Sequence, residues 1–198
     1  MKLANRISLV RMSLPVLFLP LILADFTFAK FLALLVFMIG SATDWLDGYV
    51  ARKYNQISYF GKLMDPLADK VLVASVLISL VQIDSYVLPC WVAVAIIARD
   101  FIISGLRQLA MHNKYTLDAD SLGKHKTAWQ MIIVMLWLTY LALKDIAAKY
   151  YTKLSENNFW SETIPEIFHW LFVVIMILTI ISGINYLWKH RKLYNKHV

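Results

Sequence analysis

The sequence predicts an all-α integral membrane protein with six transmembrane helices in a single domain over residues 1–198. Hydrophobic residues make up 60% of the 198-residue chain and charged residues 17%, a composition too apolar for an ordinary soluble domain. The mean hydropathy of +0.59 agrees with this class. The apolar residues also occur in runs of helical length, separated by short polar stretches, and not in the alternating pattern of strands.

The first predicted span covers residues 7–24. Its basic start imitates a signal peptide, but Arg11 interrupts the apolar run and no small-residue cleavage site follows, so we expect this span to be retained. The second span covers residues 31–50 and the third covers residues 63–83. A brief polar stretch separates them and predicts a short loop.

The fourth predicted span covers residues 86–109 and is followed by a polar loop over residues 111–123. The fifth covers residues 124–143, a mixed-charge loop follows over residues 144–163, and the sixth covers residues 164–188. Most lysines and arginines fall on the side that holds both termini, which places that side in the cytoplasm.

The net charge of +7 is explained by this arrangement. Basic residues flank the apolar spans, a pattern that suits an anionic membrane surface and anionic substrates. We therefore expect the lipid bilayer as a partner and no nucleic acid.

The stretch over residues 44–69 carries four carboxylates among apolar runs. On a helix, about 100° per residue places Asp44, Asp47 and Arg52 within an arc of roughly 140°. Asp65 and Asp69 are four residues apart and also share a face. Four carboxylates aimed at one point require raised pKa values or bound cations. Oxygen ligands favour Mg²⁺ or Mn²⁺, and two such ions roughly 4 Å apart suit phosphoryl transfer.

An alternative is that these acids line solvated helix ends or pair with neighbouring basic residues. The neighbours in question are Arg52, Lys53, Lys62 and Lys70. Ionisable groups next to membrane segments are costly and usually functional, which favours the metal site.

The pattern D-x2-D-G-x2-A-R-x8-G-x3-D-x3-D resembles, without a departure, the signature of the CDP-alcohol phosphatidyltransferases. The resemblance implies the CDP-alcohol phosphotransferase fold, CMP as the leaving group, an alcohol as the acceptor and a homodimer. It also implies that Asp69 is the base that deprotonates the acceptor, within a two-metal site of all four aspartates. The residues that would shape the CDP-diacylglycerol pocket are Gly48, Ala51, Arg52 and Gly61.

The N-terminal segment also looks like the family pattern, in which Asn, Thr and Arg follow at fixed offsets. Here they are Asn5, Ser8 and Arg11, so Ser replaces Thr, and the proline that often precedes the Asn is absent. The likeness assigns Asn5 and Arg11 to the CDP-diacylglycerol side of the site.

Two further stretches, I-A-R-D-F-I-I-S-G-L-R and L-G-K-H-K-T-A-W-Q-M, resemble those of bacterial family members that use sn-glycerol 3-phosphate. The implied reaction converts CDP-diacylglycerol and sn-glycerol 3-phosphate into phosphatidylglycerophosphate and CMP, at the cytoplasmic face of the bacterial inner membrane. An acceptor that carries a phosphate needs a second anion site. The cations available for it are Arg99, Arg107, Lys124 and Lys126.

The sequence also allows a purely structural role for each of these four cations. Arg99 and Arg107 are eight residues apart and share a helix face, yet Arg99 and Asp100 also fit a buried ion pair. Lys124 and Lys126 also fit ordinary flanking charge at the start of a span. An anion among the first amides of that helix would offset the unfavourable placement of positive charge there.

Other functions are also compatible with the sequence. Within the family, the alternatives are a phosphatidylinositol phosphate synthase, a phosphatidylserine synthase and a cardiolipin synthase, which differ in the acceptor. A serine-using enzyme has no need of the basic residues around the fourth and fifth spans. Outside enzymes, a cation transporter would use the four acids as its ion site, but the sequence shows no paired halves with broken helices.

Overall fold

The computed structural model describes residues 3–54, 59–112, 121–150, 159–189 and 191. It describes only the backbone of residues 3–9, 11, 44–54, 59–66, 69, 111–112, 121–125 and 159. Within these ranges the chain forms helices joined by short turns, and no strand occurs. The all-α class that the sequence predicts is confirmed.

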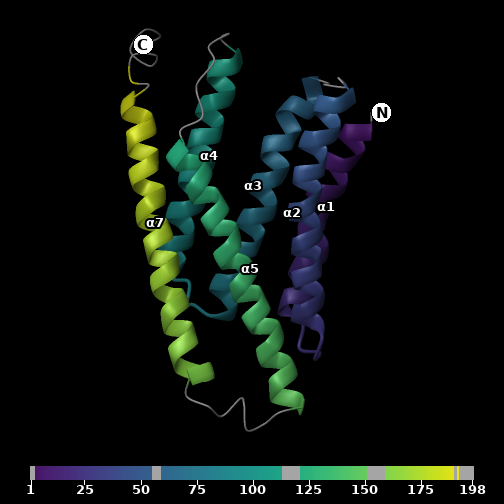
Figure 1. Cartoon of the computed structure of the whole chain (residues 1–198), viewed down its shortest axis with the longest axis vertical. Coiled ribbons are helices and arrows are strands. Elements are labelled where there is room, and N and C mark those ends of the chain that lie inside the picture. The colour runs from purple at the N-terminus through teal and green to yellow at the C-terminus, as the bar shows by residue number, and fades with distance from the viewer. Residues whose placement is uncertain (1–2, 55–58, 113–120, 151–158, 190, 192–198) are drawn as a thin grey trace.

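Six long helices and one π-helical turn make up the described part of the chain. They are α1 (Leu3–Leu23), α2 (Ala29–Tyr54), α3 (Tyr59–Ile83), α4 (Cys90–His112), α5 (Ser121–Tyr150), the π-helical turn η1 (Phe159–Thr163) and α7 (Ile164–Lys189). The long helices run along a common axis, and α7 ends at the end of the bundle where α1 begins (Figure 1). Each of the six predicted spans corresponds to one long helix.

The loop predicted over residues 111–123 is wrong at both ends. Helix α4 continues to His112 and α5 begins at Ser121, so the helical segments take in part of that loop. Gly123 lies inside α5, because one glycine in a helix costs only about 1 kcal/mol relative to alanine, which tertiary contacts can offset. Lys126, one turn further along, is held by an ion pair to α4.

The loop predicted over residues 144–163 is wrong in the same way. Helix α5 continues to Tyr150, and η1 begins at Phe159. Side-chain contacts with the start of α2 and with the turn before it hold this polar end of α5. Lys30 Nζ lies 2.7 Å from Asp145 Oδ1, and Lys149 Nζ donates to Thr27 Oγ1 at 3.1 Å. The mixed charges that indicated a loop therefore anchor a helix.

Helices α1, α2 and α3 form one packed group. Helix α1 contacts both of the others, and the group buries Phe18, Phe37 and Leu77 completely. Gly40 permits the close approach of these helices, since a Cβ at this position would lie 2.7 Å from Leu72 Cδ2 and 3.0 Å from Leu14 Cδ1.

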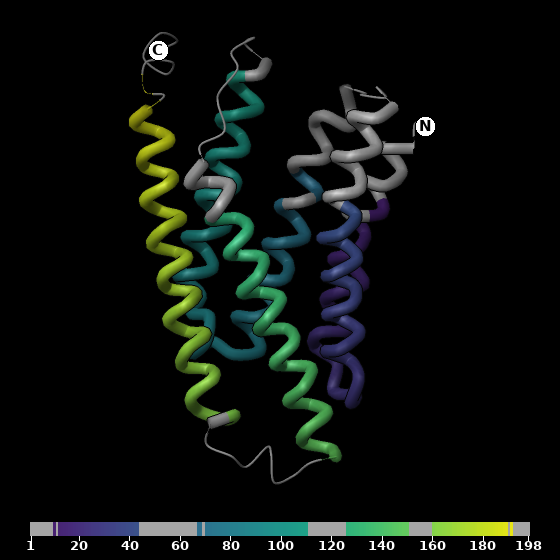
Figure 2. Tube along the Cα trace, viewed as in Figure 1, coloured from purple at the N-terminus to yellow at the C-terminus, as the bar shows by residue number. Residues whose placement is uncertain are grey.

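Helices α4, α5 and α7 form a second group. Its core includes Ile96, Trp137 and Phe172, which are at most 1% exposed, and the Trp137 ring lies 4.9 Å from that of Phe168. The two groups meet where α5 contacts α2 and where α3 contacts α4. Helix α5 therefore crosses the bundle obliquely and contacts both groups (Figure 2).

Two helical segments of the described chain are long and apolar enough to cross a membrane, namely residues 126–150 and 160–189. Shorter apolar segments cover residues 12–23, 29–43 and 70–83. Large apolar side chains also point outward, among them Val16 at 74% exposure and Trp188 at 67%. Exposed apolar surface on this scale is typical of lipid contact.

Candidate active site

The two halves of the aspartate motif lie on consecutive helices. Asp44 and Asp47 belong to the last part of α2, and Asp65 and Asp69 belong to the first half of α3. The backbone is helical over both segments, so the three-residue and four-residue spacings keep each pair on one face of its helix. This backbone geometry fits a shared oxygen-ligand site. The four carboxylate groups lie outside the described side chains, so their convergence stays a prediction.

A described contact near the motif joins α2 to α3. Gly40 is one helical turn before Asp44, and Leu72 is three residues after Asp69. The Leu72 side chain occupies the space that a Cβ on Gly40 would need. The absence of a side chain at Gly40 therefore leaves room on α2 for the Leu72 side chain of α3, near the motif.

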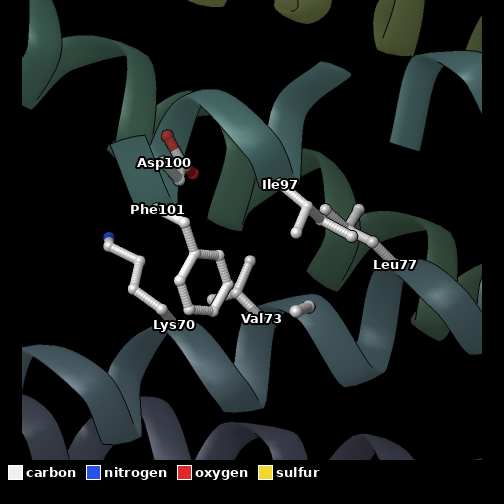
Figure 3. Close-up of a pocket in the computed structure, with 7 residues that line it drawn as sticks. Lys70, Val73, Leu77, Ile97, Asp100 and Phe101 are labelled. Carbon is white, nitrogen blue, oxygen red and sulfur yellow. The ribbon is translucent and has the colours of Figure 1, made fainter. Parts of the chain in front are cut away.

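A narrow crevice separates α3 from α4 beside the motif. Lys70, the residue after Asp69, lies on its α3 side, and Asp100 and Phe101 lie on its α4 side. Lys70 extends from α3 toward α4, and Val73, Leu77 and Ile97 form the apolar wall (Figure 3). The crevice therefore brings Lys70, which follows the last aspartate of the motif, and Asp100 of α4 to one space.

Asp100 is the centre of a buried polar cluster, which we define as Arg99, Asp100, Lys126 and Ser182. Lys126 Nζ donates to Asp100 Oδ1 at 2.7 Å, and Arg99 Nη1 lies 3.2 Å from the same oxygen. Arg99 Nη2 donates to Ser182 Oγ at 2.8 Å. The cluster joins α4, α5 and α7, and its charged side chains are 14%, 9% and 2% exposed for Arg99, Asp100 and Lys126.

The cluster carries an excess of positive charge. Arg99 and Lys126 contribute two positive charges and Asp100 contributes one negative charge, so one positive charge is left over. An isolated buried charge is costly, and an opposite charge nearby favours the charged forms. Arg99 Nε is also buried without a hydrogen-bond partner among the described residues. The arrangement suits an anionic ligand.

Arg107 lies two turns beyond Arg99 on α4, and both arginines reach α7. The Arg107 guanidinium lies 5.9 Å from the centre of the Tyr186 ring, and Arg99 contacts Ser182. Their shared face, which the spacing of eight residues predicts, is therefore the face toward α7. Arg107 itself is exposed, so it is open to a soluble anion.

The structure describes the two predicted lysines of α5 to different extents. The sequence predicts that the helix opens at Lys124, but it begins at Ser121, so Lys124 and Lys126 lie in its first two turns. Lys126 is buried on Asp100 and the side chain of Lys124 lies outside the described part. The ion pair considered for Arg99 and Asp100 is present, and Lys126 joins it.

The sequence predicts no role for Asp100 beyond that pair and does not single out Ser182. The sequence does mark Asp100 as a residue of interest, because a charged residue within an apolar span needs a partner. It marks Ser182 only weakly, as a small polar residue followed by glycine in an otherwise apolar helix. Nothing in the spacing along the chain connects it with Arg99.

The remaining predicted site residues have described backbones only. Asn5 and Arg11 belong to α1, Gly48, Ala51 and Arg52 belong to α2, and Gly61 belongs to α3. No group of three His, Cys, Asp or Glu side chains able to hold a metal occurs among the side chains that the structure describes. The four aspartates of the motif are not among those side chains.

Comparison with known proteins gives a consistent result. A family model described as CDP-alcohol phosphatidyltransferase matches residues 1–181. A protein of Bacillus subtilis (strain 168) named "CDP-diacylglycerol--glycerol-3-phosphate 3-phosphatidyltransferase" is 40% identical over 150 residues, which cover 70% of this chain and 77% of that protein. Proteins of the same name from Rickettsia bellii and Rickettsia typhi are each 36% identical, over 80% and 93% of this chain and 78% and 94% of theirs. The chain therefore belongs to the CDP-alcohol phosphatidyltransferase family.

Proposed function

We propose that this protein transfers the phosphatidyl group of CDP-diacylglycerol to sn-glycerol 3-phosphate and releases CMP. The observation that carries the proposal is the similarity to relatives that bear the name of this activity, which extends over as much as 93% of the chain. The buried cationic cluster beside the aspartate motif supports it, because this acceptor brings a phosphate of its own.

Arg99, Arg107, Lys124 and Lys126 bind the phosphate of the acceptor in this proposal. A guanidinium has five N–H donors, and the described contacts of Arg99 use two of them, one to Asp100 and one to Ser182. The ammonium group of Lys126 has three donors, and the contact with Asp100 uses one. Asp100 thus holds both cations in place, and donors are left for phosphate oxygens.

The aspartate motif handles the donor substrate. Asp44, Asp47, Asp65 and Asp69 would hold two divalent cations, Mg²⁺ or Mn²⁺, for which their oxygen ligands are suited. When bound, such ions neutralise charge on the pyrophosphate and on the departing CMP. The small residues Gly48, Ala51 and Gly61 would leave room for the nucleotide next to the helix backbones, and the same pocket would include Arg52, Asn5 and Arg11.

The transfer step uses one base. The carboxylate of Asp69 takes the proton from the acceptor hydroxyl, whose oxygen then forms a bond to the phosphorus of the phosphatidyl group. The bond between that phosphorus and the oxygen of CMP breaks, and CMP departs with the electron pair. Lys70 follows Asp69 and faces the crevice to Asp100, so the base lies on the helix that borders the acceptor cations.

We further propose that the protein lies in a bacterial inner membrane as a homodimer, with both termini and the site at the cytoplasmic face. The distribution of lysine and arginine supports this orientation. It gives the soluble acceptor direct access, while the acyl chains of CDP-diacylglycerol stay in the bilayer.

The test is CMP release from CDP-diacylglycerol by the purified protein in detergent with Mg²⁺ or Mn²⁺. The acceptors compared are sn-glycerol 3-phosphate, inositol phosphate, serine and phosphatidylglycerol. We expect release that requires sn-glycerol 3-phosphate. Release that requires a different acceptor would overturn the assignment of the acceptor, and no release with any of them would overturn the proposed activity.

A further inference from the structure

The side chain of Arg99 lies against α7, a helix to which neither the sequence nor the proposed function assigns a role. Arg99 Nη2 donates to Ser182 Oγ at 2.8 Å across a separation of 83 residues. Ser182 is 2% exposed, so this contact is shielded from water. A hydrogen bond to a charged group is stronger than one between neutral groups, particularly where water is excluded.

The neighbouring residue makes room for the same side chain. A Cβ at Gly183 would lie 2.9 Å from Arg99 Cγ, 3.4 Å from its Nε and 3.8 Å from its Cδ. Cγ and Cδ belong to the stem of the arginine and Nε to its guanidinium, so an added methyl group would displace the Arg99 side chain. Ser182 and Gly183 together fix the position of the Arg99 side chain. Ser182 accepts a hydrogen bond from it, and Gly183 leaves the space that the side chain occupies.

Asp100 alone does not provide this orientation. It is adjacent to Arg99 in the chain, and successive residues on a helix project about 100° apart. Its Oδ1 also accepts a shorter bond from Lys126, at 2.7 Å against 3.2 Å from Arg99. The hydroxyl of Ser182 is the described contact that comes to Arg99 from another helix and is used by no other residue of the cluster.

We propose that Ser182 and Gly183 are positioning residues, which hold the Arg99 guanidinium in the orientation that binds the phosphate of the acceptor. The inference rests on the proposed function, in which Arg99 contacts that phosphate. It adds α7 to the acceptor site, and both residues lie beyond residue 181, where the match to the family model ends. An arginine side chain has about 2 kcal/mol of rotamer entropy, so fixing it in advance favours binding of the acceptor.

Two substitutions with matched controls test this role. We expect Ser182→Ala to raise the KM for sn-glycerol 3-phosphate roughly tenfold, the lower end of what a hydrogen bond to a charged group contributes. Its control is Ser79→Ala, because Ser79 is equally buried and donates to Val76 O of its own helix. The KM for CDP-diacylglycerol and kcat should change less than about twofold, as expected when a contact to one substrate is weakened equally in the ground and transition states.

The second substitution is Gly183→Ala, with Gly105→Ala as its control. A Cβ at Gly105 would meet no heavy atom within 4 Å, whereas one at Gly183 would strike Arg99. Alanine favours a helix over glycine at both positions, so a weakened helix would not explain an effect confined to Gly183. We expect the KM for sn-glycerol 3-phosphate to rise in Gly183→Ala and to stay at the wild-type value in Gly105→Ala.

A double-mutant cycle separates action through Arg99 from a general structural effect. We expect Ser182→Ala to have no further effect on the KM for sn-glycerol 3-phosphate in an Arg99→Ala background. An equal effect in both backgrounds, or an unchanged KM in Ser182→Ala and Gly183→Ala, would overturn the inference while wild-type turnover upholds the proposed function. Absence of wild-type turnover with sn-glycerol 3-phosphate would overturn the proposed function, and the inference with it.

Discussion

Replacement of Asp100 by asparagine keeps the shape of the side chain and removes the one negative charge of the buried cluster. Arg99 and Lys126 would then lie beside each other without a counter-ion, at 14% and 2% exposure. Removal of one partner from a buried ion pair costs about 3–5 kcal/mol. For a chain of this length, each kcal/mol lowers the melting temperature by about 2–4 °C, so we expect a decrease of about 6–20 °C.

Asp145→Asn provides the matched control. Asp145 also accepts from a lysine, Lys30, at 2.7 Å, but these two side chains are 25% and 23% exposed. A pair that is partly open to water is screened by solvent and contributes about 0–1 kcal/mol, so the expected decrease is about 0–4 °C. The assay is thermal unfolding of both variants in the same detergent. Equal decreases in the two variants would refute the reasoning that the loss of a counter-ion costs more stability where the remaining charges are buried.

Three further predictions concern the motif and its support. Asp69→Asn should abolish CMP release and leave the melting temperature within a few degrees of the wild type, because it removes the base; an active Asp69→Asn protein would exclude that role. Chelation by EDTA should stop turnover and added Mg²⁺ or Mn²⁺ should restore it, since the four carboxylates need a cation; turnover in EDTA would contradict the metal site. Gly40→Ala should destabilise the protein by about 1–3 kcal/mol, because its Cβ would lie 2.7 Å from Leu72, whereas the unobstructed Gly105→Ala should not; thermal unfolding of the two proteins distinguishes these outcomes.

The helices could be predicted from the sequence because each helix that crosses a membrane appears in it as a long apolar run. Each of the six apolar runs corresponds to one long helix, and the errors are confined to the ends. The sequence predicts a loop at the polar end of α5 because the charges there are visible in the sequence, while their partners, Thr27 in the α1–α2 turn and Lys30 at the start of α2, are not. Lys30 and Asp145 are 115 residues apart, and such a contact has no local signature.

The site was predictable to different degrees. The aspartate motif is local, so its spacing along two helices could be read directly from the chain. The sequence and the resemblance point to the cations that we propose for the acceptor, but not to their arrangement, because the Asp100 carboxylate meets both Arg99 and Lys126 only in the folded chain. The contribution of α7 depends on a contact between residues 99 and 182, which only the fold brings together.

The most direct test of the proposed transfer is the fate of a labelled acceptor. Purified protein with Mg²⁺ would be given CDP-diacylglycerol and ¹³C-labelled sn-glycerol 3-phosphate, and the lipids and nucleotides would be measured by mass spectrometry. We expect labelled phosphatidylglycerophosphate and CMP to form in equal amounts. CMP that forms with unlabelled phosphatidic acid as the lipid product would show that water is the acceptor and would contradict transfer to sn-glycerol 3-phosphate.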